Sequence, residues 1–219
     1  ITKGVNSFVI DGDDGVVLID TGIPRFHGAI EAGLAGIGRA LSDVVAILVT
    51  HAHMDHVGGL AAVQTASGAK VYASCADTPA VEGRVAMSPP PFADRIPFIK
   101  PVFRWLPSVA PVSVDHQVDV GPIDGLPEDI TVIETPGHTL GHVSYLLDRS
   151  GGVAFVGDAA VHTRGGQVKR GWMNRSTPEF DASLRRLASA DFAIACFGHA
   201  KPLMADASGA FQRFVATLD

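Results

Sequence analysis

Three histidines and one aspartate lie within six residues of one another: His51, His53, Asp55 and His56. Imidazole nitrogens and carboxylate oxygens are the ligands that a borderline cation such as zinc prefers. An isolated histidine in a loop is usually solvated or structural, but four such groups at this spacing are not expected by chance. The motif therefore predicts a metal centre.

Three later apolar segments each end in one further potential ligand. These ligands are His138, Asp158 and His199, and a glycine directly precedes each of them. Open α/β sheets gather their sites at the carboxyl ends of their strands. The repeated arrangement predicts that these side chains meet the motif of residues 51–56.

Short apolar runs and turn residues predict the elements that must position these side chains. Strands are expected at residues 6–10, 16–19, 44–49, 70–73, 130–134, 143–147, 153–156 and 192–197, and helices at residues 26–40 and 57–66, from residue 176 and from about residue 207. The alternation of strand and helix indicates the α/β class, with two mixed sheets covered by helices on their outer faces.

One segment departs from this pattern. Residues 88–111 contain seven of the 14 prolines, so they cannot form a central strand or an uninterrupted helix. We interpret residues 84–116 as an insertion in a single domain that spans residues 1–219. Its aromatic side chains are expected to line an apolar pocket beside the metal cleft, with a structural loop or a self-association surface as alternatives. These aromatic residues are Phe92, Phe98, Phe103 and Trp105.

The composition excludes several classes of protein. The 219 residues are 47% hydrophobic and 18% charged, which predicts a sizeable core and excludes intrinsic disorder. The net charge of −6 argues against binding to nucleic acid or to an anionic membrane. The longest apolar run, residues 44–49, is far shorter than the roughly 20 residues that a membrane-spanning helix needs.

The two cysteines are too few and too far apart for a disulfide framework, which indicates a reducing compartment and core thiols. A cytoplasmic location is the expectation, and a leader removed before Ile1 is the alternative. The cysteines are Cys75 and Cys196, and the histidines without a motif, expected at the surface or in loops, are His27, His116 and His162.

Taken together, the motifs resemble those of the metallo-β-lactamase-fold hydrolase superfamily. The matching segments, in the order of that family, are residues 18–22, 51–56, 135–142, 157–158 and 198–199. The resemblance covers nearly the whole chain. It implies an αβ/βα sandwich, in which two mixed β-sheets are flanked by helices, with two Zn²⁺ per chain at one edge and iron or manganese as alternatives.

The resemblance also implies a role for each candidate residue. It assigns a first metal to His51, His53 and His138, a second metal to Asp55, His56 and His199, and a bridging position to Asp158. Asp20 would hydrogen-bond the site without binding metal. His142 would be structural and not a ligand.

A centre of this type activates a bridging water as a hydroxide nucleophile and polarises a substrate oxygen. Asp55 would orient that water and relay a proton. The expected reaction is hydrolysis of a small ester, lactone, thioester or related bond. Candidate substrate contacts are Phe103 and Trp105 in the insertion, and Lys169, Arg170 and Trp172 in an expected loop after Asp158.

Other activities of the superfamily fit less well. A bridging carboxylate such as Asp158 disfavours a β-lactamase, and the net charge disfavours a nuclease. Residues 159–162 lack the tyrosine that many acyl-homoserine lactone hydrolases have, and the basic C-terminal region of glyoxalase II is absent after His199. The interpretation is therefore a generic small hydrolase of the glyoxalase II-like and lactonase-like branch that has a bridging Asp, monomeric or homodimeric. A mononuclear-iron oxidoreductase similar to persulfide dioxygenases is the alternative, and a phosphodiesterase or a metal-dependent structural protein is disfavoured.

Overall fold

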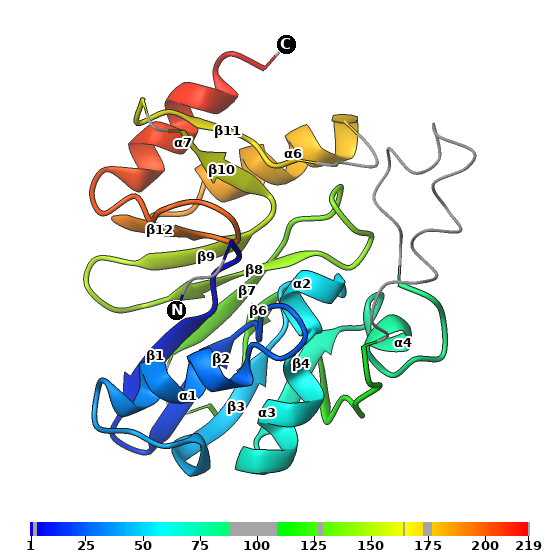
Figure 1. Cartoon of the computed structure of the whole chain (residues 1–219). Helices are drawn as coiled ribbons and strands as arrows, with labels where there is room; N and C mark the ends of the chain where they lie inside the picture. Colours follow the sequence, from blue (N-terminus) through cyan, green and yellow to red (C-terminus); the bar gives the residue numbers. More distant parts are fainter. Residues whose placement is uncertain (2–3, 88–108, 127–128, 164, 173–176, 219) are drawn as a thin grey trace.

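Two five-stranded β-sheets face each other, and helices cover the outer face of each sheet (Figure 1). The predicted αβ/βα sandwich is thereby confirmed. The computed structural model describes residues 1, 4–87, 109–126, 129–163, 165–172 and 177–218. Within these ranges, no helix is long and apolar enough to cross a membrane.

The first sheet has the strand order β1-β2-β3-β4-β5. Its strands are β1 (Phe8–Gly12), β2 (Gly15–Ile19), β3 (Val44–Leu48), β4 (Lys70–Ser74) and β5 (His116–Val118). β1 and β2 form an antiparallel hairpin, whereas β2 to β5 run parallel, so their carboxyl ends share one edge. The helices of this half are α1 (His27–Ala35), the 3₁₀ helix η1 (Leu41–Asp43), α2 (Met54–Val57), α3 (Leu60–Ser67) and α4 (Thr78–Val81).

The second sheet has the order β12-β9-β8-β7-β6, and a two-stranded hairpin, β10-β11, lies beside it. Its elements are β6 (Gly121–Pro122), β7 (Ile130–Glu134), β8 (Val143–Leu147), β9 (Val153–Gly157), β10 (Ala160–His162), β11 (Val168–Arg170), α6 (Thr177–Ala188), β12 (Ile194–Phe197) and α7 (Ala207–Val215). β12 and β9 are parallel, which brings the residues after both strands to the same edge.

Alternation along the strands divides the core into three layers. Leu18 and Ile47 pack toward the outer helices α1 and α3. Their neighbours Val17 and Leu48 pack between the two sheets, together with residues of the second sheet such as Tyr145. A third cluster lies between the second sheet and helices α6 and α7. The two sheets are therefore held by apolar packing, which leaves their shared edge available for polar side chains.

Two predicted helices are wrong in their bounds. The helix expected at residues 57–66 is two helices, α2 and α3, separated at Gly58 and Gly59. A Cβ at Gly58 would clash with Pro24, and one at Gly59 would lie 2.5 Å from the carbonyl oxygen of Thr21. The helix expected to reach residue 40 ends at Ala35, because the chain then turns through Gly38 at a φ of 76°.

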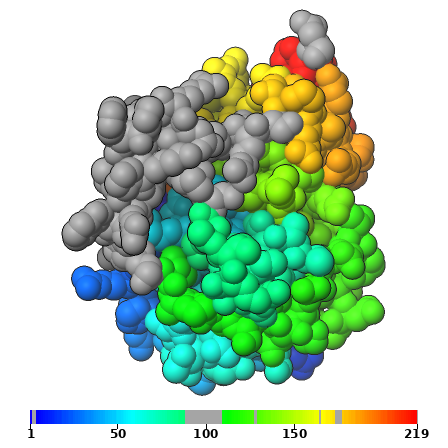
Figure 2. All heavy atoms as spheres, turned by 90° about the vertical axis from the view of Figure 1, so that its right-hand side faces the viewer, coloured from blue at the N-terminus to red at the C-terminus, as the bar shows by residue number. Residues whose placement is uncertain are grey.

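Among the described residues, six short elements have no counterpart in the predictions: η1, α4, β5, β6, β10 and β11. On the face seen in Figure 2, the residues around α4 (teal) lie beside residues 109–118 (green), and Val112 donates its backbone N–H to the carbonyl oxygen of Val81. The aromatic residues of the expected insertion, Phe92, Phe98, Phe103 and Trp105, lie outside the described residues.

Candidate metal centre

The seven predicted ligands all follow the carboxyl ends of strands. His51 and His53 come after β3, and Asp55 and His56 lie in α2, which begins directly after them. The remaining three ligands follow β7, β9 and β12, and they are His138, Asp158 and His199. The topology therefore brings together residues that are up to 148 positions apart in sequence.

These side chains form three overlapping clusters, in which the potential ligand atoms lie within 4.8 Å of one another. The clusters are His51, His53 and His138; His51, His56 and Asp158; and Asp55, His56 and His199. In the first cluster, His138 Nε2 and His53 Nδ1 are 3.0 Å apart. In the third, His199 Nε2 is 3.2 Å from Asp55 Oδ2.

The Asp158 carboxylate lies between the histidines of both halves. Its Oδ2 is 3.5 Å from His138 Nε2 and 3.4 Å from His199 Nε2. Its Oδ1 is 3.5 Å from His56 Nε2. Gly198 must lack a side chain here, because a Cβ would collide with Oδ1 of Asp158. One carboxylate thus faces ligand atoms assigned to two different cations.

Asp20 orients two of the histidines through hydrogen bonds at their Nδ1 atoms, directly to His56 and through Thr50 to His51. Its Oδ2 accepts the Nδ1–H of His56 at 2.7 Å and the hydroxyl of Thr50 at 2.7 Å. The Thr50 hydroxyl, in turn, accepts the Nδ1–H of His51 at 3.0 Å. Both imidazoles therefore direct Nε2 toward the site, where its lone pair is available once the imidazole is neutral. Asp20 has a φ of 57°, in the left-handed region that Asp tolerates better than most residues.

Backbone carbonyls hold two further histidines in the same tautomer. His138 donates its Nδ1–H to the carbonyl oxygen of Trp172 at 2.9 Å, and His199 donates to that of Gly4 at 2.8 Å. Asn6 strengthens the second arrangement, because its side-chain amide donates to the carbonyl oxygens of Phe197 and Ala200. Chain segments before β1 and after β11 therefore set the direction of ligands that come from other strands.

His142 is placed to hold Asp158 and does not point its lone pair at the clusters. Its Nε2 accepts the backbone N–H of Asp158 at 3.0 Å, so the proton is on Nδ1, which lies 2.8 Å from the hydroxyl of Thr135. A Cβ at Gly157 would lie 2.7 Å from the same Nε2, and the φ of Gly157 is 50°. Only glycine at that position allows this approach.

The electrostatics of the centre separate the histidines into two groups. Burial lowers the pKa of His51 and lowers that of His53 to about 4, and neighbouring imidazoles add to both effects. Burial also opposes the charged form of His56 and His199, but nearby carboxylates outweigh it. Asp158 and Asp20 raise the pKa of His56 to about 9, and Asp158 and Asp55 raise that of His199 to about 11.

The pKa values of the carboxylates Asp55 and Asp158 are lowered. Burial alone would raise the pKa of Asp55, but a hydrogen bond from His199 and the charge of His56 lower it to about 2. The pKa of Asp158 is lowered below its usual range, since His56 and His199 outweigh its burial. Both side chains are therefore ionised at neutral pH, and the centre attracts positive charge.

The donor set fits divalent cations. His51 Nε2 and His56 Nε2 are buried and have no hydrogen-bond partner among the described residues. Buried nitrogens of this kind are costly unless a proton donor or a metal satisfies them. In addition, ligand atoms that share one tetrahedral cation at about 2.0–2.1 Å lie roughly 3.3 Å apart. Five of the separations, at 3.0–3.5 Å, match that spacing, and all ligand atoms of a cluster lie within 4.8 Å of one another.

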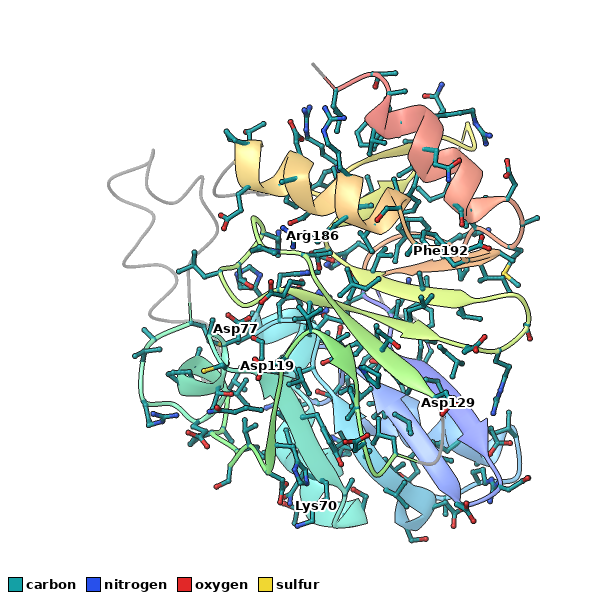
Figure 3. The ribbon with its side chains drawn as sticks, turned by 180° about the vertical axis from the view of Figure 1, so that it is seen from behind. Lys70, Asp77, Asp119, Asp129, Arg186 and Phe192 are labelled. Atoms are coloured by element: carbon teal, nitrogen blue, oxygen red, sulfur yellow. The ribbon has the colours of Figure 1, made fainter. Side chains whose placement is uncertain are left out.

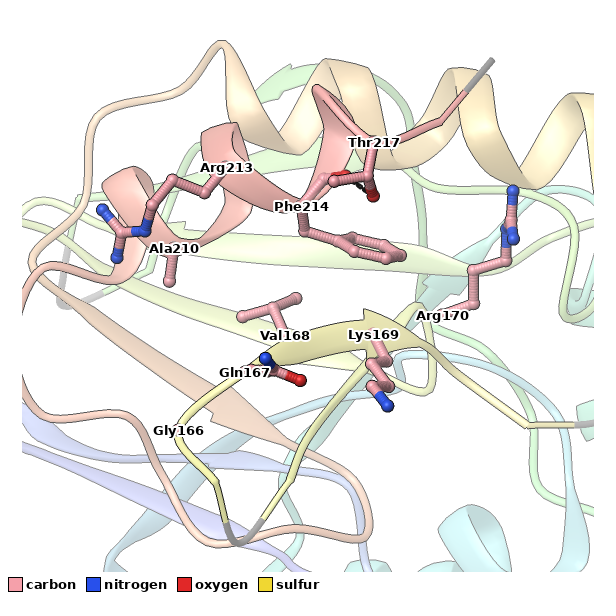
Figure 4. Close-up of a pocket in the computed structure, with 9 residues that line it drawn as sticks. All are labelled: Gly166, Gln167, Val168, Lys169, Arg170, Ala210, Arg213, Phe214 and Thr217. Carbon is pink, nitrogen blue, oxygen red and sulfur yellow. Dashed lines mark hydrogen bonds between the residues drawn. The ribbon is translucent and has the colours of Figure 1, made fainter.

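Two of the candidate substrate contacts lie in a strand and not in a loop. Lys169 and Arg170 belong to β11, which pairs with β10. Figure 4 shows both residues beside a cavity of about 590 Å³ between β11 and α7, and none of the seven predicted ligands lines it. Arg170 also makes two hydrogen bonds, at 2.6 and 2.7 Å, to the carboxylate of Asp181.

Trp172 is placed differently. Its carbonyl oxygen holds His138, and its side chain is 66% exposed. Leu140, two residues after His138, is 70% exposed. Phe103 and Trp105, the remaining candidates, lie outside the described residues.

The cysteines and the other histidines are not members of the three ligand clusters. Cys196 is buried in β12, where burial raises its pKa to about 12, but Cys75 is exposed, contrary to the expected core thiol. His27 and His116 are exposed, as predicted. His162 is partly buried in β10 and stacks on Phe197.

Sequence reasoning did not find Thr50, Gly4 or Asn6. Thr50 and Gly4 each contact a predicted ligand, and Asn6 contacts the backbone on both sides of His199. Thr50 could have been noticed because it directly precedes His51. Gly4 and Asn6 act across about 190 residues of sequence, and no local pattern marks them.

Comparison with known proteins is consistent with this geometry. Residues 2–199 match the metallo-beta-lactamase superfamily. A hydroxyacylglutathione hydrolase of Cereibacter sphaeroides is 33% identical over 195 residues, which cover 88% of this chain and 59% of that enzyme. A probable metallo-hydrolase of Bacillus subtilis is 31% identical, over 66% of this chain and 55% of its own length. The chain thus spans little more than half of these two relatives.

Solved structures show the same fold. A mutant metallo-beta-lactamase from Cronobacter sakazakii superposes with a TM-score of 0.71 at 23% identity, over 90% of this chain and 75% of that one. A metallo-beta-lactamase family protein from Thermus thermophilus gives a TM-score of 0.68 at 26% identity, over 97% and 73%.

Proposed function

Since the chain belongs to the metallo-beta-lactamase superfamily, we propose that it is a metal-dependent hydrolase that cleaves a thioester, ester or lactone bond. The observation that supports this most directly is the position of Asp158 between two histidine clusters. In this proposal the residues that hold two cations, with zinc the first choice, are His51, His53 and His138 for one, Asp55, His56 and His199 for the other, and Asp158 for both. Two such cations would supply an activated water and a Lewis acid for the substrate oxygen.

The protein's own groups have distinct parts in the reaction. Asp55 is half-buried and ionised, so its free lone pairs are available to accept a hydrogen bond from the attacking water and then its proton. Asp20, through His56 and Thr50, fixes the imidazoles and keeps them from rotating. Asp158 balances positive charge, and His142 holds its backbone in place.

Substrate selection is proposed to depend on an apolar rim. Trp172 and Leu140 are exposed apolar side chains, and both are linked to His138: Leu140 lies two residues after it, and the Trp172 carbonyl oxygen accepts its Nδ1–H. Such side chains would suit an apolar acyl group. Phe103 and Trp105 remain proposed parts of the same pocket. A thioester is the first choice of substrate, because the hydroxyacylglutathione hydrolase relative is named for that chemistry. A cytoplasmic location and a small-molecule substrate, with no nucleic acid or membrane partner, belong to the same proposal.

The test is a hydrolysis panel on protein whose metal content has been measured. S-acyl thioesters, lactones, phosphodiesters and a chromogenic β-lactam are compared before and after treatment with a chelator. We expect turnover of an acyl substrate that the chelator abolishes and zinc restores. Asp158→Ala serves as the inactive variant, and His116→Ala, at the exposed amino end of β5, serves as the matched histidine control.

Three outcomes would overturn the proposal. Protein that binds no divalent cation would exclude a metal-dependent reaction. One iron per chain with oxygen consumption would favour the oxidoreductase alternative. Cleavage of the β-lactam or the phosphodiester in preference to every acyl substrate would assign the enzyme to another branch of the superfamily.

A further inference from the structure

Asp77 is a buried carboxylate that none of the ligand sets uses. It lies three residues beyond the end of β4 and is 7% exposed (labelled in Figure 3). Its Oδ2 accepts the backbone N–H of Ala52 at 2.8 Å and the hydroxyl of Thr139 at 3.0 Å. Its Oδ1 accepts the backbone N–H of Gly141 at 3.2 Å.

These three donors come from two loops in different halves of the sandwich. Ala52 lies between His51 and His53, after β3 of the first sheet. Thr139 follows His138, in the loop between β7 and β8 of the second sheet. One carboxylate therefore joins the loops that contain all three residues of the first cluster.

The approach of the two loops is tight. A Cβ added to Gly141 would lie 2.5 Å from Asp77 Oδ1 and 2.5 Å from the hydroxyl of Ser74. The Ser74 hydroxyl also accepts the backbone N–H of Asp77 at 3.2 Å, which fixes the start of α4 against the end of β4. The Asp77 carboxylate therefore has little freedom to shift without moving the two loops.

We propose that Asp77 is a positioning residue that sets the spacing of His51, His53 and His138 and thereby the affinity of that cluster for a divalent cation. This inference rests on the proposed metal centre and adds a determinant that lies outside the ligand set. Hydrogen-bond partners that orient ligands typically change metal affinity by about 10–100-fold when they are removed.

Asp77→Asn is the direct test, because the amide keeps the shape but turns one acceptor into a donor that faces an N–H or the Thr139 hydroxyl. Zinc affinity is measured by competition with a chromophoric chelator, and the visible spectrum of the cobalt-substituted protein reports ligand geometry. We expect the affinity for the ion held by His51, His53 and His138 to fall about 10–100-fold and the cobalt spectrum to change.

Asp115→Asn is the matched control. Asp115 also accepts one backbone N–H, from Val71, and one side-chain donor, from Lys70, but it lies beside the amino end of β4. The control should lose some thermal stability and keep the zinc affinity and cobalt spectrum of the wild type. Thr139→Val removes only one of the three hydrogen bonds, so it keeps the proposal testable if Asp77→Asn fails to fold. It should weaken zinc binding by a smaller factor, about 3–10-fold, below the range for loss of a whole partner.

Unchanged zinc affinity and an unchanged cobalt spectrum in Asp77→Asn, or in Thr139→Val if the first variant does not fold, would overturn the role of Asp77. Normal metal binding by the wild type without acyl hydrolysis would overturn the proposed function alone, since the affinity comparison would still stand. A wild-type protein that binds no divalent cation would overturn both.

Discussion

Asp20 and His56 form a hydrogen bond of 2.7 Å between Oδ2 and Nδ1, with both side chains at most 3% exposed. The bond joins the end of β2 to α2, and the same Oδ2 also accepts the Thr50 hydroxyl. One carboxylate thus directs the lone pairs of two histidines toward the proposed centre.

Asp20→Asn is therefore expected to weaken zinc binding by about 10–100-fold without removing a ligand. The amide nitrogen would face either the backbone N–H of Thr50, or the Thr50 hydroxyl and His56 Nδ1–H. In either orientation, a donor would face a donor where a hydrogen bond is now made. Chelator competition measures the affinity. Asp11→Asn, which removes a surface partner of Arg39, is the control and should bind zinc as the wild type does. Equal affinity in both variants would show that Asp20 has no part in ligand orientation.

Asp158→Ala is expected to have a larger effect than Asp20→Asn. Loss of this carboxylate removes a contact to His56, His138 and His199 together, so both cations and the activity should be lost in parallel. Metal analysis of the purified variant, with thermal melting to confirm folding, makes the measurement. Two retained cations with full turnover would mean that Asp158 is not a ligand.

The metal-free protein should become less stable as the pH rises above neutrality. The folded-state pKa values of His56 and His199, about 9 and about 11, lie above the ordinary 6.5, so their contribution is complete below pH 6.5 and is lost as the pH rises through these values. The pKa of Asp55 is about 2 in the folded protein, below its ordinary value of 3.8. Asp55 therefore stabilises the folded state above pH 3.8, and this contribution is lost as the pH falls toward 2. Urea titrations of chelator-treated protein between pH 6 and 11 measure the effect.

The same protons must leave when a metal binds, because a protonated imidazole has no lone pair to offer. Calorimetry of zinc binding in buffers of different ionisation enthalpy should therefore show release of about two protons at pH 7. Stability of the metal-free protein that increases from pH 7 to 10, with no proton release, would contradict this charge distribution.

Trp172→Ala should alter substrate preference without altering metal content. The substitution keeps the carbonyl that holds His138 and removes only the exposed ring, so the KM for bulky apolar acyl substrates should rise more than that for small ones. Ile37→Ala removes an exposed apolar side chain near the amino end of β3 and is the control. Phe103→Ala and Trp105→Ala are expected to act like Trp172→Ala. Equal changes for large and small substrates would indicate a structural role.

Arg170→Ala should affect stability and not KM. The guanidinium of Arg170, in β11, forms an ion pair with Asp181, in α6. This partly exposed pair is expected to contribute about 0.5–1 kcal/mol to the free energy of unfolding. Denaturant titration gives the stability, and the acyl substrate panel gives KM. A raised KM with unchanged stability would instead support a contact between Arg170 and the substrate.

For physical reasons, the sequence predicts the long strands well and identifies the candidate ligands that the fold brings together. β7 and β8 have the predicted bounds, because alternation and uniform burial mark Ile130–Glu134 and Val143–Leu147. The ligands are recognisable because each follows such a strand and has an unambiguous chemistry. The break between α2 and α3 was not predictable, since it depends on the approach of Pro24 and Thr21 to Gly58 and Gly59.

Asp77 shows the limit of the same rule. It also follows the end of a strand, so the position alone could have marked it, but it lacks the His-rich neighbourhood of the other candidates. Its contacts, to Ala52 and to Gly141, exist only after the two sheets have packed. Lys169 and Arg170 show a different limit: the sequence places them in a loop, whereas they lie in β11. Their contact with substrate stays a prediction.

The hydrogen bond between His199 and Gly4 spans 195 positions of sequence and has a consequence for biosynthesis. At about 5–20 residues per second, roughly 10–40 seconds of translation separate the two residues. During that time His51, His53 and His56 are synthesised without the last candidate ligand, so the seven side chains cannot meet until residue 199 has been added. In the proposed centre, the cation assigned to Asp55, His56 and His199 would therefore gain its full ligand set only after residue 199 has been synthesised, whereas the three histidines of the other cluster are complete once residue 138 has been synthesised.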